Sequence, residues 1–143
     1  MPEFQYAKGR IGESLQFISL EMIEFSQDYS DKTWNDYQQD KKVQKLIDRT
    51  VENILTALIE VSGTILVEEN IAVENYADAL KKCAKLFNFS EEEQENMAKL
   101  AIARNRLAHR YLNFRWQVIN MYKTHSSLIQ RLLAAILERE GNV

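Results

Sequence analysis

Apolar residues recur along this chain at alternating three- and four-residue steps, the spacing that gathers them on one face of an α-helix. The first such stripe predicts a helix near the N-terminus and consists of Ile11, Leu15, Ile18, Met22 and Phe25. A polar break follows, and we expect Asp31 to cap the next helix. A longer stripe then predicts a second helix over residues 33–66; its apolar members include Val43, Val51, Leu58, Val61 and Ile65.

Three further helices are predicted in the C-terminal half of the chain. The third covers residues 73–87. Ser90 followed by Glu93 is a capping box, so a fourth helix begins there, with three consecutive glutamates in its first turn. The fifth helix covers residues 114–138. Each of these segments carries one apolar face, which is typical of helices that pack together around a shared core.

Glycine and proline are scarce: four Gly and one Pro in 143 residues favour long helices with short connections. Gly141-Asn142 is a stop signal for the last helix. Gly63, near the end of the second helix, indicates close packing or a frayed end. The sequence therefore predicts an all-α, antiparallel up-and-down bundle of four to five helices, with residues 1–143 forming a single domain. We expect the residues before about Tyr6 to be poorly ordered.

Cysteine usage and hydropathy narrow the class of protein. Cys83 is the only cysteine, so neither an intramolecular disulfide nor a thiolate zinc site can form, which suits a reducing cytoplasm. The first residues carry no basic start leading into an apolar run, so we expect no signal peptide. Glu60 and Glu68 interrupt the longest apolar stretches, and we expect no membrane-spanning segment.

The net charge of −3 conceals a strong asymmetry along the chain. From Lys99 to Arg131 there are seven Lys or Arg and no Asp or Glu, so this segment carries +7 and the remainder −10. A cationic segment in an acidic protein indicates a local anion site rather than a general nucleic-acid coat. Some of these cations can equally well solvate a helix face or pair with the acidic helices.

One short segment combines side chains that can bind a phosphodiester and move a proton: Arg104, Asn105, His109 and Tyr111, in the pattern Arg-Asn, three residues, His, one residue, Tyr. Arginine can bind a phosphodiester, and histidine can move a proton near neutral pH. Taken singly, each has an ordinary alternative: a satisfied surface histidine, an arginine in an ion pair, a tyrosine ring in the core. Four uncommon residue types in one pattern favour a functional site.

The spacing of the motif also sets a geometric problem. At about 100° per residue, Arg104 and Tyr111 share a helix face, and Asn105 can touch His109. Arg104 and His109 lie roughly 140° apart around the axis, so a straight helix cannot aim both at one phosphate. Either the helix distorts or ends near Ala108, or a second copy of the chain completes the site across a two-fold axis.

The motif resembles the Arg-x4-His-x-Tyr signature of HepT, the HEPN-domain toxin of HepT/MntA toxin–antitoxin systems. The order of helices over residues 11–138 is also similar, with a second helix that contains Arg49-Thr50-Val51-Glu52-Asn53-Ile54 and a third that is led by Tyr76-Ala77-Asp78-Ala79-Leu80. The resemblance implies a homodimer with two motifs at a shared cleft. It also implies a metal-independent endoribonuclease that acts on mRNA or tRNA without a cofactor.

The same resemblance assigns roles to individual residues. His109 is the general acid or base, Arg104 binds the phosphate and stabilises its developing charge, and Asn105 orients one of these groups. An MntA-like minimal nucleotidyltransferase antitoxin silences the toxin by transferring AMP to Tyr111, which blocks the cleft and neutralises its cations.

This chain departs from relatives at two motif positions. Arg106 and Arg110 stand where relatives often carry an apolar and an acidic residue, and both are candidates for phosphate binding. The extra cations favour RNA binding, or indicate a different substrate. After the motif, Phe114 and Trp116 can stack on bases, although core packing is expected for at least one of them.

Three alternatives stay open at this point. The basic cleft can instead hold a nucleotide or substrate anion in a non-catalytic accessory subunit of a nucleotidyltransferase. A purely structural bundle is the second. The third, a metal site on His109 and His125, is disfavoured: a spacing of 16 residues fits no helical ligand pair, and no acidic residue lies between Lys99 and Arg131.

Overall fold

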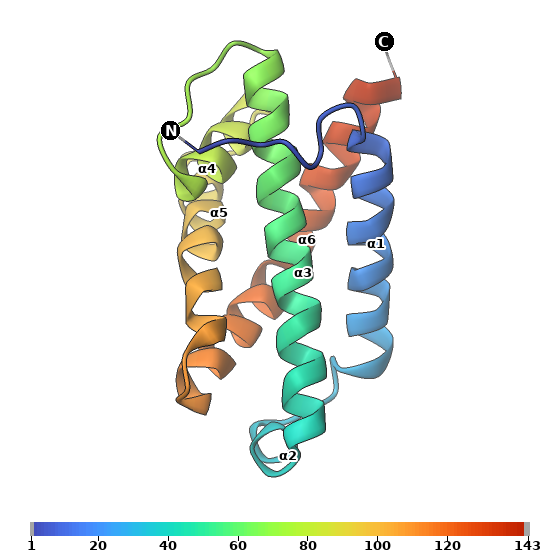
Figure 1. Ribbon diagram of the computed structural model, residues 1–143, viewed down its shortest axis with the longest axis vertical. Coiled ribbons are helices and arrows are strands. Elements are labelled where there is room, and N and C mark those ends of the chain that lie inside the picture. The colour runs from blue at the N-terminus through green and yellow to red at the C-terminus, as the bar shows by residue number, and fades with distance from the viewer. Residues whose placement is uncertain (1, 142–143) are drawn as a thin grey trace.

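The computed structural model describes residues 2–141, and every regular element within them is helical (Figure 1). In chain order the elements are α1 (Ile11–Asp28), α2 (Trp34–Gln39), α3 (Lys41–Glu68), α4 (Tyr76–Leu86), α5 (Glu91–Ala103), the 3₁₀ helix η1 (Arg104–Ala108) and α6 (Leu112–Gly141). α1 descends, α3 rises through the middle, α5 descends on the other side, and α6 returns upward behind α3 (Figure 1). The predicted all-α class is confirmed.

The core forms around α3, which packs against α1, α4 and α6. The predicted stripe of α1 is buried in full, and Ile47, Ile54 and Leu58 of α3 are completely excluded from solvent. By length and composition α3 is apolar enough to cross a membrane, but 67% of its most apolar 18-residue window is buried inside the bundle. Its hydrophobicity is therefore accounted for by core packing.

The predicted second helix is wrong in one respect: residues 33–66 form two helices. Asp31 does not cap the first of them. Thr33 does, in a capping box with Asp36, and α2 ends after six residues. Asp40 then adopts an extended backbone, and its carboxylate accepts hydrogen bonds from the N–H groups of Lys42 and Val43 at the start of α3. Two strong N-cap residues seven positions apart therefore divide the segment.

The remaining boundaries differ less from expectation. The third helix begins at Tyr76, later than predicted, because Asn75 caps it. The capping box of Ser90 and Glu93 is confirmed at the start of α5. The last helix begins at Leu112, two residues before the prediction, and the described chain ends at Gly141 still within it. Asn142, the second residue of the predicted stop signal, lies outside the described residues.

The N-terminal segment crosses the front of α3 near its C-terminal end (Figure 1). Contrary to the expectation of poor order before Tyr6, the ring of Phe4 is buried. It lies directly on Gly63 of α3 and meets the ring of Tyr76 edge-on at 6.2 Å. A Cβ at position 63 would overlap the Phe4 ring. Gly63 thus marks close packing, as predicted, but against the N-terminal segment.

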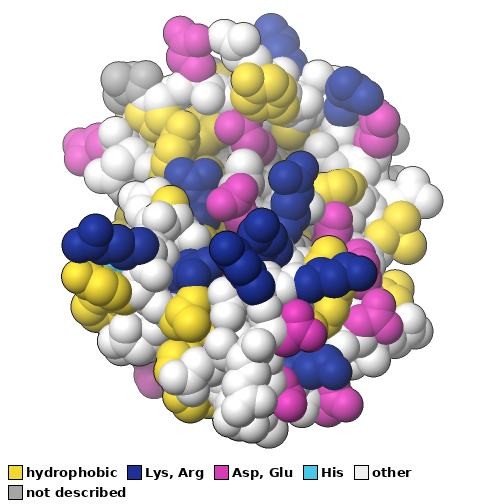
Figure 2. Space-filling view, turned by 60° about the horizontal axis from the view of Figure 1, so that its bottom comes forward, with side chains coloured by type: hydrophobic (Ala, Val, Ile, Leu, Met, Phe, Trp, Pro, Cys, Tyr) yellow, Lys and Arg dark blue, Asp and Glu magenta, His cyan; other side chains and the backbone are white. Residues whose placement is uncertain are grey.

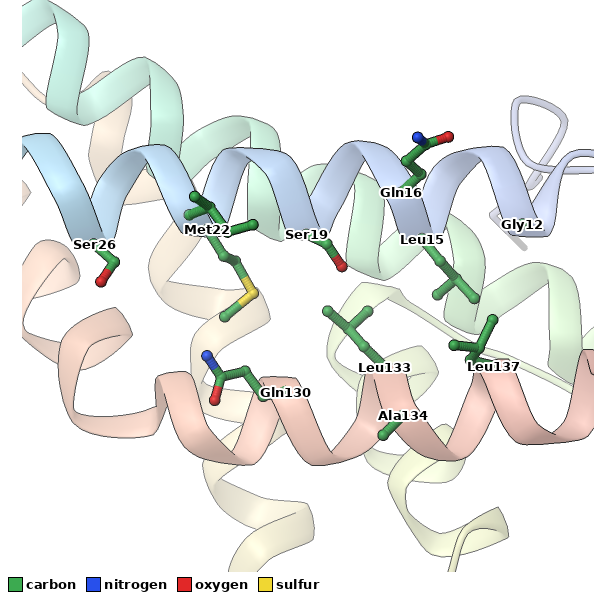
Figure 3. Close-up of a pocket in the computed structure, with 11 residues that line it drawn as sticks. Gly12, Leu15, Gln16, Ser19, Met22, Ser26, Gln130, Leu133, Ala134 and Leu137 are labelled. Carbon is green, nitrogen blue, oxygen red and sulfur yellow. The ribbon is translucent and has the colours of Figure 1, made fainter.

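α1 and α6 leave an apolar groove of about 630 Å³ between them. Figure 3 shows Leu15, Ser19 and Met22 of α1 pointing toward Gln130 and Leu133 of α6. None of the residues that line this groove belongs to the segment 104–111. The motif therefore lies apart from this groove.

Candidate active site

The backbone changes form within the motif. α5 ends at Ala103, residues Arg104–Ala108 form the 3₁₀ helix η1, and His109 has an extended backbone with φ −75° and ψ 139°. The expectation that the helix distorts or ends near Ala108 is confirmed. A 3₁₀ helix turns faster than an α-helix, with three residues per turn. Together with the extended residue at 109, this frees His109 from the direction that a continuous α-helix would impose.

Arg104 is partly buried against α3 and α4. Its Nη1 donates to Oγ1 of Thr56 at 3.2 Å, and its guanidinium carbon lies 5.3 Å from the centre of the Tyr76 ring. Its Nη2 makes a long contact of 3.5 Å with Oδ1 of Asn105. A hydroxyl, an aromatic face and an amide hold the guanidinium in place, and none of them neutralises its charge.

The Glu60 carboxylate lies close enough to the Arg104 guanidinium for their charges to attract each other. Burial raises the pKa of Glu60, and the nearby Arg104 guanidinium and the Tyr6 backbone N–H only partly oppose this shift. Its Oε2 atom is buried without a hydrogen-bond partner among the described residues, and no ion pair with Arg104 forms. The positive charge of Arg104 therefore stays available to an anion.

His109 is exposed and belongs to a small aromatic cluster. Its ring lies 5.0 Å from that of Tyr111 and meets the ring of Phe114 edge-on at 4.8 Å. The backbone N–H of Tyr111 donates to its Nδ1 at 3.2 Å. In the neutral imidazole the proton must then reside on Nε2, which is available to a ligand.

Tyr111 and the two additional arginines complete the motif. The Tyr111 side chain is 50% exposed, and Nη2 of Arg110 donates to its hydroxyl at 3.2 Å. The Arg110 guanidinium carbon also lies 5.1 Å from the centre of that ring. Arg106 is exposed, and within residues 2–141 it makes no ion pair. Arg110 therefore adds positive charge beside the phenol, and Arg106 adds a cation, unpaired within the described chain, to the same segment.

The structure thus divides the predicted residues into two groups. His109, Arg110 and Tyr111 lie together with Phe114, while Arg104 contacts Thr56 of α3 and Tyr76 of α4. No hydrogen bond among the described residues joins Arg104 to His109. Asn105 contacts Arg104 rather than His109, so the predicted contact between the amide and the imidazole is absent here.

Sequence reasoning missed the residues that anchor the chain just after the motif. Arg115 donates to Asp48 of α3 at 2.7 Å, and the hydroxyl of Tyr37 donates to the same carboxylate at 2.6 Å. Trp116 packs on Tyr37 with ring centres 4.8 Å apart, so Trp116 has the core role and Phe114 the exposed one. Arg115 and Trp116 thus contact residues 67 or more positions away in the chain, and only the position of Arg115 one turn after Tyr111 hinted at such a role.

Figure 2 turns the lower end of the bundle in Figure 1 toward the viewer, and lysine and arginine side chains form a band across this face. Among residues 2–141, no group of three or more His, Cys, Asp and Glu side chains is placed to hold a metal ion. The chemistry that the motif presents is therefore that of guanidinium groups, an imidazole, a phenol and aromatic faces. This set binds phosphates and transfers protons.

Comparison with known proteins agrees with this chemistry. No curated protein matches the sequence. The model of a protein family described as "Ribonuclease HepT-like" matches residues 19–136, from the middle of α1 nearly to the end of α6, and includes the whole motif. A match over most of the chain settles membership: this protein belongs to the HepT-like ribonuclease family.

Proposed function

We propose that this ribonuclease is the toxin of a cytoplasmic toxin–antitoxin pair and cleaves RNA without a metal, using Arg104 and His109. The observation that carries the proposal is the break at η1. It leaves the imidazole of His109 exposed beside an aromatic cluster and keeps the charge of Arg104 free of any ion pair. An exposed imidazole with fixed cations nearby suits attack on a phosphodiester.

The proposed reaction is an internal transfer at phosphorus. The RNA 2′-oxygen attacks the adjacent phosphorus as its proton leaves, and the bond to the 5′-oxygen breaks. The products are a 2′,3′-cyclic phosphate and a 5′-hydroxyl. Arg104 stabilises the charge on the phosphate oxygens, and His109 accepts the 2′ proton at Nε2 and returns it to the departing 5′-oxygen. To accept the 2′ proton there, the ring must carry hydrogen on Nδ1, which displaces the contact from the Tyr111 N–H.

A homodimer fits the separation of the two key residues. No hydrogen bond joins Arg104 to His109 within the described residues, so a second copy across a two-fold axis can supply the missing partner. A mixture of Arg104→Ala and His109→Ala proteins tests this arrangement. If each site draws one residue from each chain, exchange of subunits restores cleavage; sites built within one chain stay inactive in the mixture.

Tyr111 is the proposed acceptor of AMP from an MntA-like nucleotidyltransferase antitoxin. In that step the phenolic oxygen forms a bond to the α-phosphorus of ATP, pyrophosphate leaves, and the phenol loses its proton. Half of the side chain is exposed, and Arg110 lies against the hydroxyl, where it can stabilise the incoming phosphate. The attached nucleotide would cover His109, whose ring lies 5.0 Å away.

The test is an RNA-cleavage assay after the intact mass has shown that the protein carries no AMP. Wild type and the His109→Ala, Arg104→Ala and His125→Ala variants are compared on single-stranded RNA and tRNA (mRNA or tRNA being the expected substrates), with and without EDTA. His125 is the matched control, because it is the only other histidine and lies outside the motif. Cleavage that survives EDTA and His125→Ala but is lost in His109→Ala supports the proposal. A folded, unmodified wild type that binds nucleotide but cuts no RNA supports the accessory-subunit function.

A further inference from the structure

A line of cations on α3 leads away from the candidate active site. Lys42, Lys45 and Arg49 follow one another at three- and four-residue steps, and all three side chains are exposed. Thr56, which binds Arg104, lies seven residues beyond Arg49 on the same side of the helix. The three cations therefore continue, along one face of α3, the surface on which Arg104 rests. We call Lys42, Lys45 and Arg49 the α3 track.

The upper part of this face is covered and the lower part is open. Glu60 and Gly63 share the face, and there the N-terminal segment crosses α3 (Figure 1). Below Thr56 the three side chains of the track are exposed. At a rise of 1.5 Å per residue, the open stretch from Thr56 to Lys42 is about 21 Å long. That length accommodates several nucleotides of an extended strand.

The cations of the track are unpaired among the described residues, whereas several other surface cations are held in ion pairs. Elsewhere on the described surface, Arg10, Lys81, Lys82, Arg131 and Arg139 each pair with a carboxylate. No ion pair within residues 2–141 involves Lys42, Lys45 or Arg49.

The acids near the track are partly engaged elsewhere. Asp48 is turned inward to Arg115 and Tyr37, and Asp40 caps the helix. Asp36, exposed near Lys42, accepts a hydrogen bond from Thr33, and Glu52 is exposed on the same face of α3 as the track. The three exposed cations of the track outnumber Glu52, the exposed carboxylate on their own face, so this face attracts anions.

We propose that the α3 track binds the backbone phosphates of an RNA strand that extends from the cleavage site along α3. This inference rests on the proposed function, which places RNA at Arg104 and His109. An acidic protein partner is the weaker reading, because Leu46 is the one exposed large apolar side chain on α3 between Lys41 and Thr56, whereas protein interfaces are anchored by clusters of such residues. Unpaired cations that follow one another along one helix face can each bind a phosphate of an extended RNA backbone.

The experiment compares two triple variants with equal loss of charge. The track variant is Lys42→Gln, Lys45→Gln, Arg49→Gln. The control is Lys8→Gln, Lys85→Gln, Lys99→Gln, which removes three exposed lysines that also make no ion pair among the described residues. Binding of a single-stranded RNA is measured at several salt concentrations with both triples in a His109→Ala background, where the RNA stays intact. Cleavage of a dinucleotide and of the long RNA is measured with His109 present.

The proposal predicts weaker RNA binding for the track variant, with a slope of log affinity against log salt reduced by about two, at roughly 0.7 per lost phosphate contact. It also predicts that dinucleotide cleavage is unchanged while long-RNA cleavage falls at least tenfold. Equal RNA binding by the track and control variants would overturn the α3 track, even with an active wild type. Loss of binding to an acidic partner protein, with RNA binding intact, would overturn it in favour of a protein interface. Failure of the proposed function gives a different result from failure of the α3 track, because the wild-type protein would then cut neither the dinucleotide nor the long RNA.

Discussion

Gly63→Ala is expected to destabilise the protein even though it removes a glycine from the interior of a helix. The ring of Phe4 occupies the place where the new Cβ would lie, and the overlap involves the ring carbon nearest the backbone as well as the outer ones. Rotating the far end of the side chain cannot relieve such an overlap. The Phe4 ring must therefore leave its site on α3 and its edge-on contact with Tyr76.

The size of the effect follows from three terms. Exposing a buried phenylalanine costs about 1.5–3 kcal/mol. Losing the aromatic pair with Tyr76 costs about 1 kcal/mol more. Replacing glycine by alanine in a helix returns about 1 kcal/mol. We therefore expect Gly63→Ala to lower the free energy of unfolding by about 2 kcal/mol.

A double-mutant cycle measured by urea unfolding tests this reasoning sharply. In a Phe4→Ala background the obstacle is gone, so Gly63→Ala should raise the free energy of unfolding by about 1 kcal/mol. The substitution thus changes sign between the two backgrounds. If Gly63→Ala destabilises the Phe4→Ala protein as much as wild type, the ring does not pack on Gly63, and the account of the N-terminal segment is wrong.

Three further predictions concern the surroundings of the motif. Burial raises the pKa of Glu60 in the folded protein above its ordinary value of 4.5, so wild-type stability falls as pH rises from the unfolded pKa through the folded one. Glu60→Gln should therefore be more stable than wild type at pH 7 by chemical denaturation, and the difference should vanish below the unfolded pKa. A difference that stays constant with pH would contradict this. Asp48→Asn leaves the partly buried guanidinium of Arg115 without its counter-charge and should lower the free energy of unfolding, measured by thermal unfolding, by about 3 kcal/mol. The control Glu13→Gln, in the exposed pair with Arg10, should lower it by under about 1 kcal/mol. Equal losses would refute the anchoring role of Asp48. Tyr111→Phe should still cleave RNA but resist the antitoxin and gain no AMP by intact mass, and an adduct on this variant would place the acceptor elsewhere.

The helices of the fold could be predicted because their signals are local. The stripe of α1 and the Ser90–Glu93 capping box each lie within a few turns of sequence, and both are confirmed. The division between α2 and α3 was missed because no glycine or proline marks it. Only the competition between the caps at Thr33 and Asp40, each of which satisfies free N–H groups, determines where the helix stops.

The candidate site could be predicted in composition but only partly in geometry. The conflict between Arg104 and His109 on a straight helix was readable from their spacing; the helix does break there, but the two side chains still have different partners. The partners of Arg104 were not readable, because Thr56 lies 48 residues away and depends on how α3 packs. The burial of Phe4 escaped prediction for the same reason: its binding site is Gly63, which indicates close packing but does not identify the partner.

The central claim is that the motif drives attack by an RNA 2′-hydroxyl without a metal. The most direct measurement compares, in EDTA, the cleavage of one RNA with that of the same RNA carrying a single 2′-deoxynucleotide immediately before the cut. The account predicts that unmodified wild-type protein cuts the first to give a 2′,3′-cyclic phosphate and a 5′-hydroxyl, and leaves the second intact at that position. Cleavage of both at equal rates, or cleavage that EDTA abolishes, would contradict it.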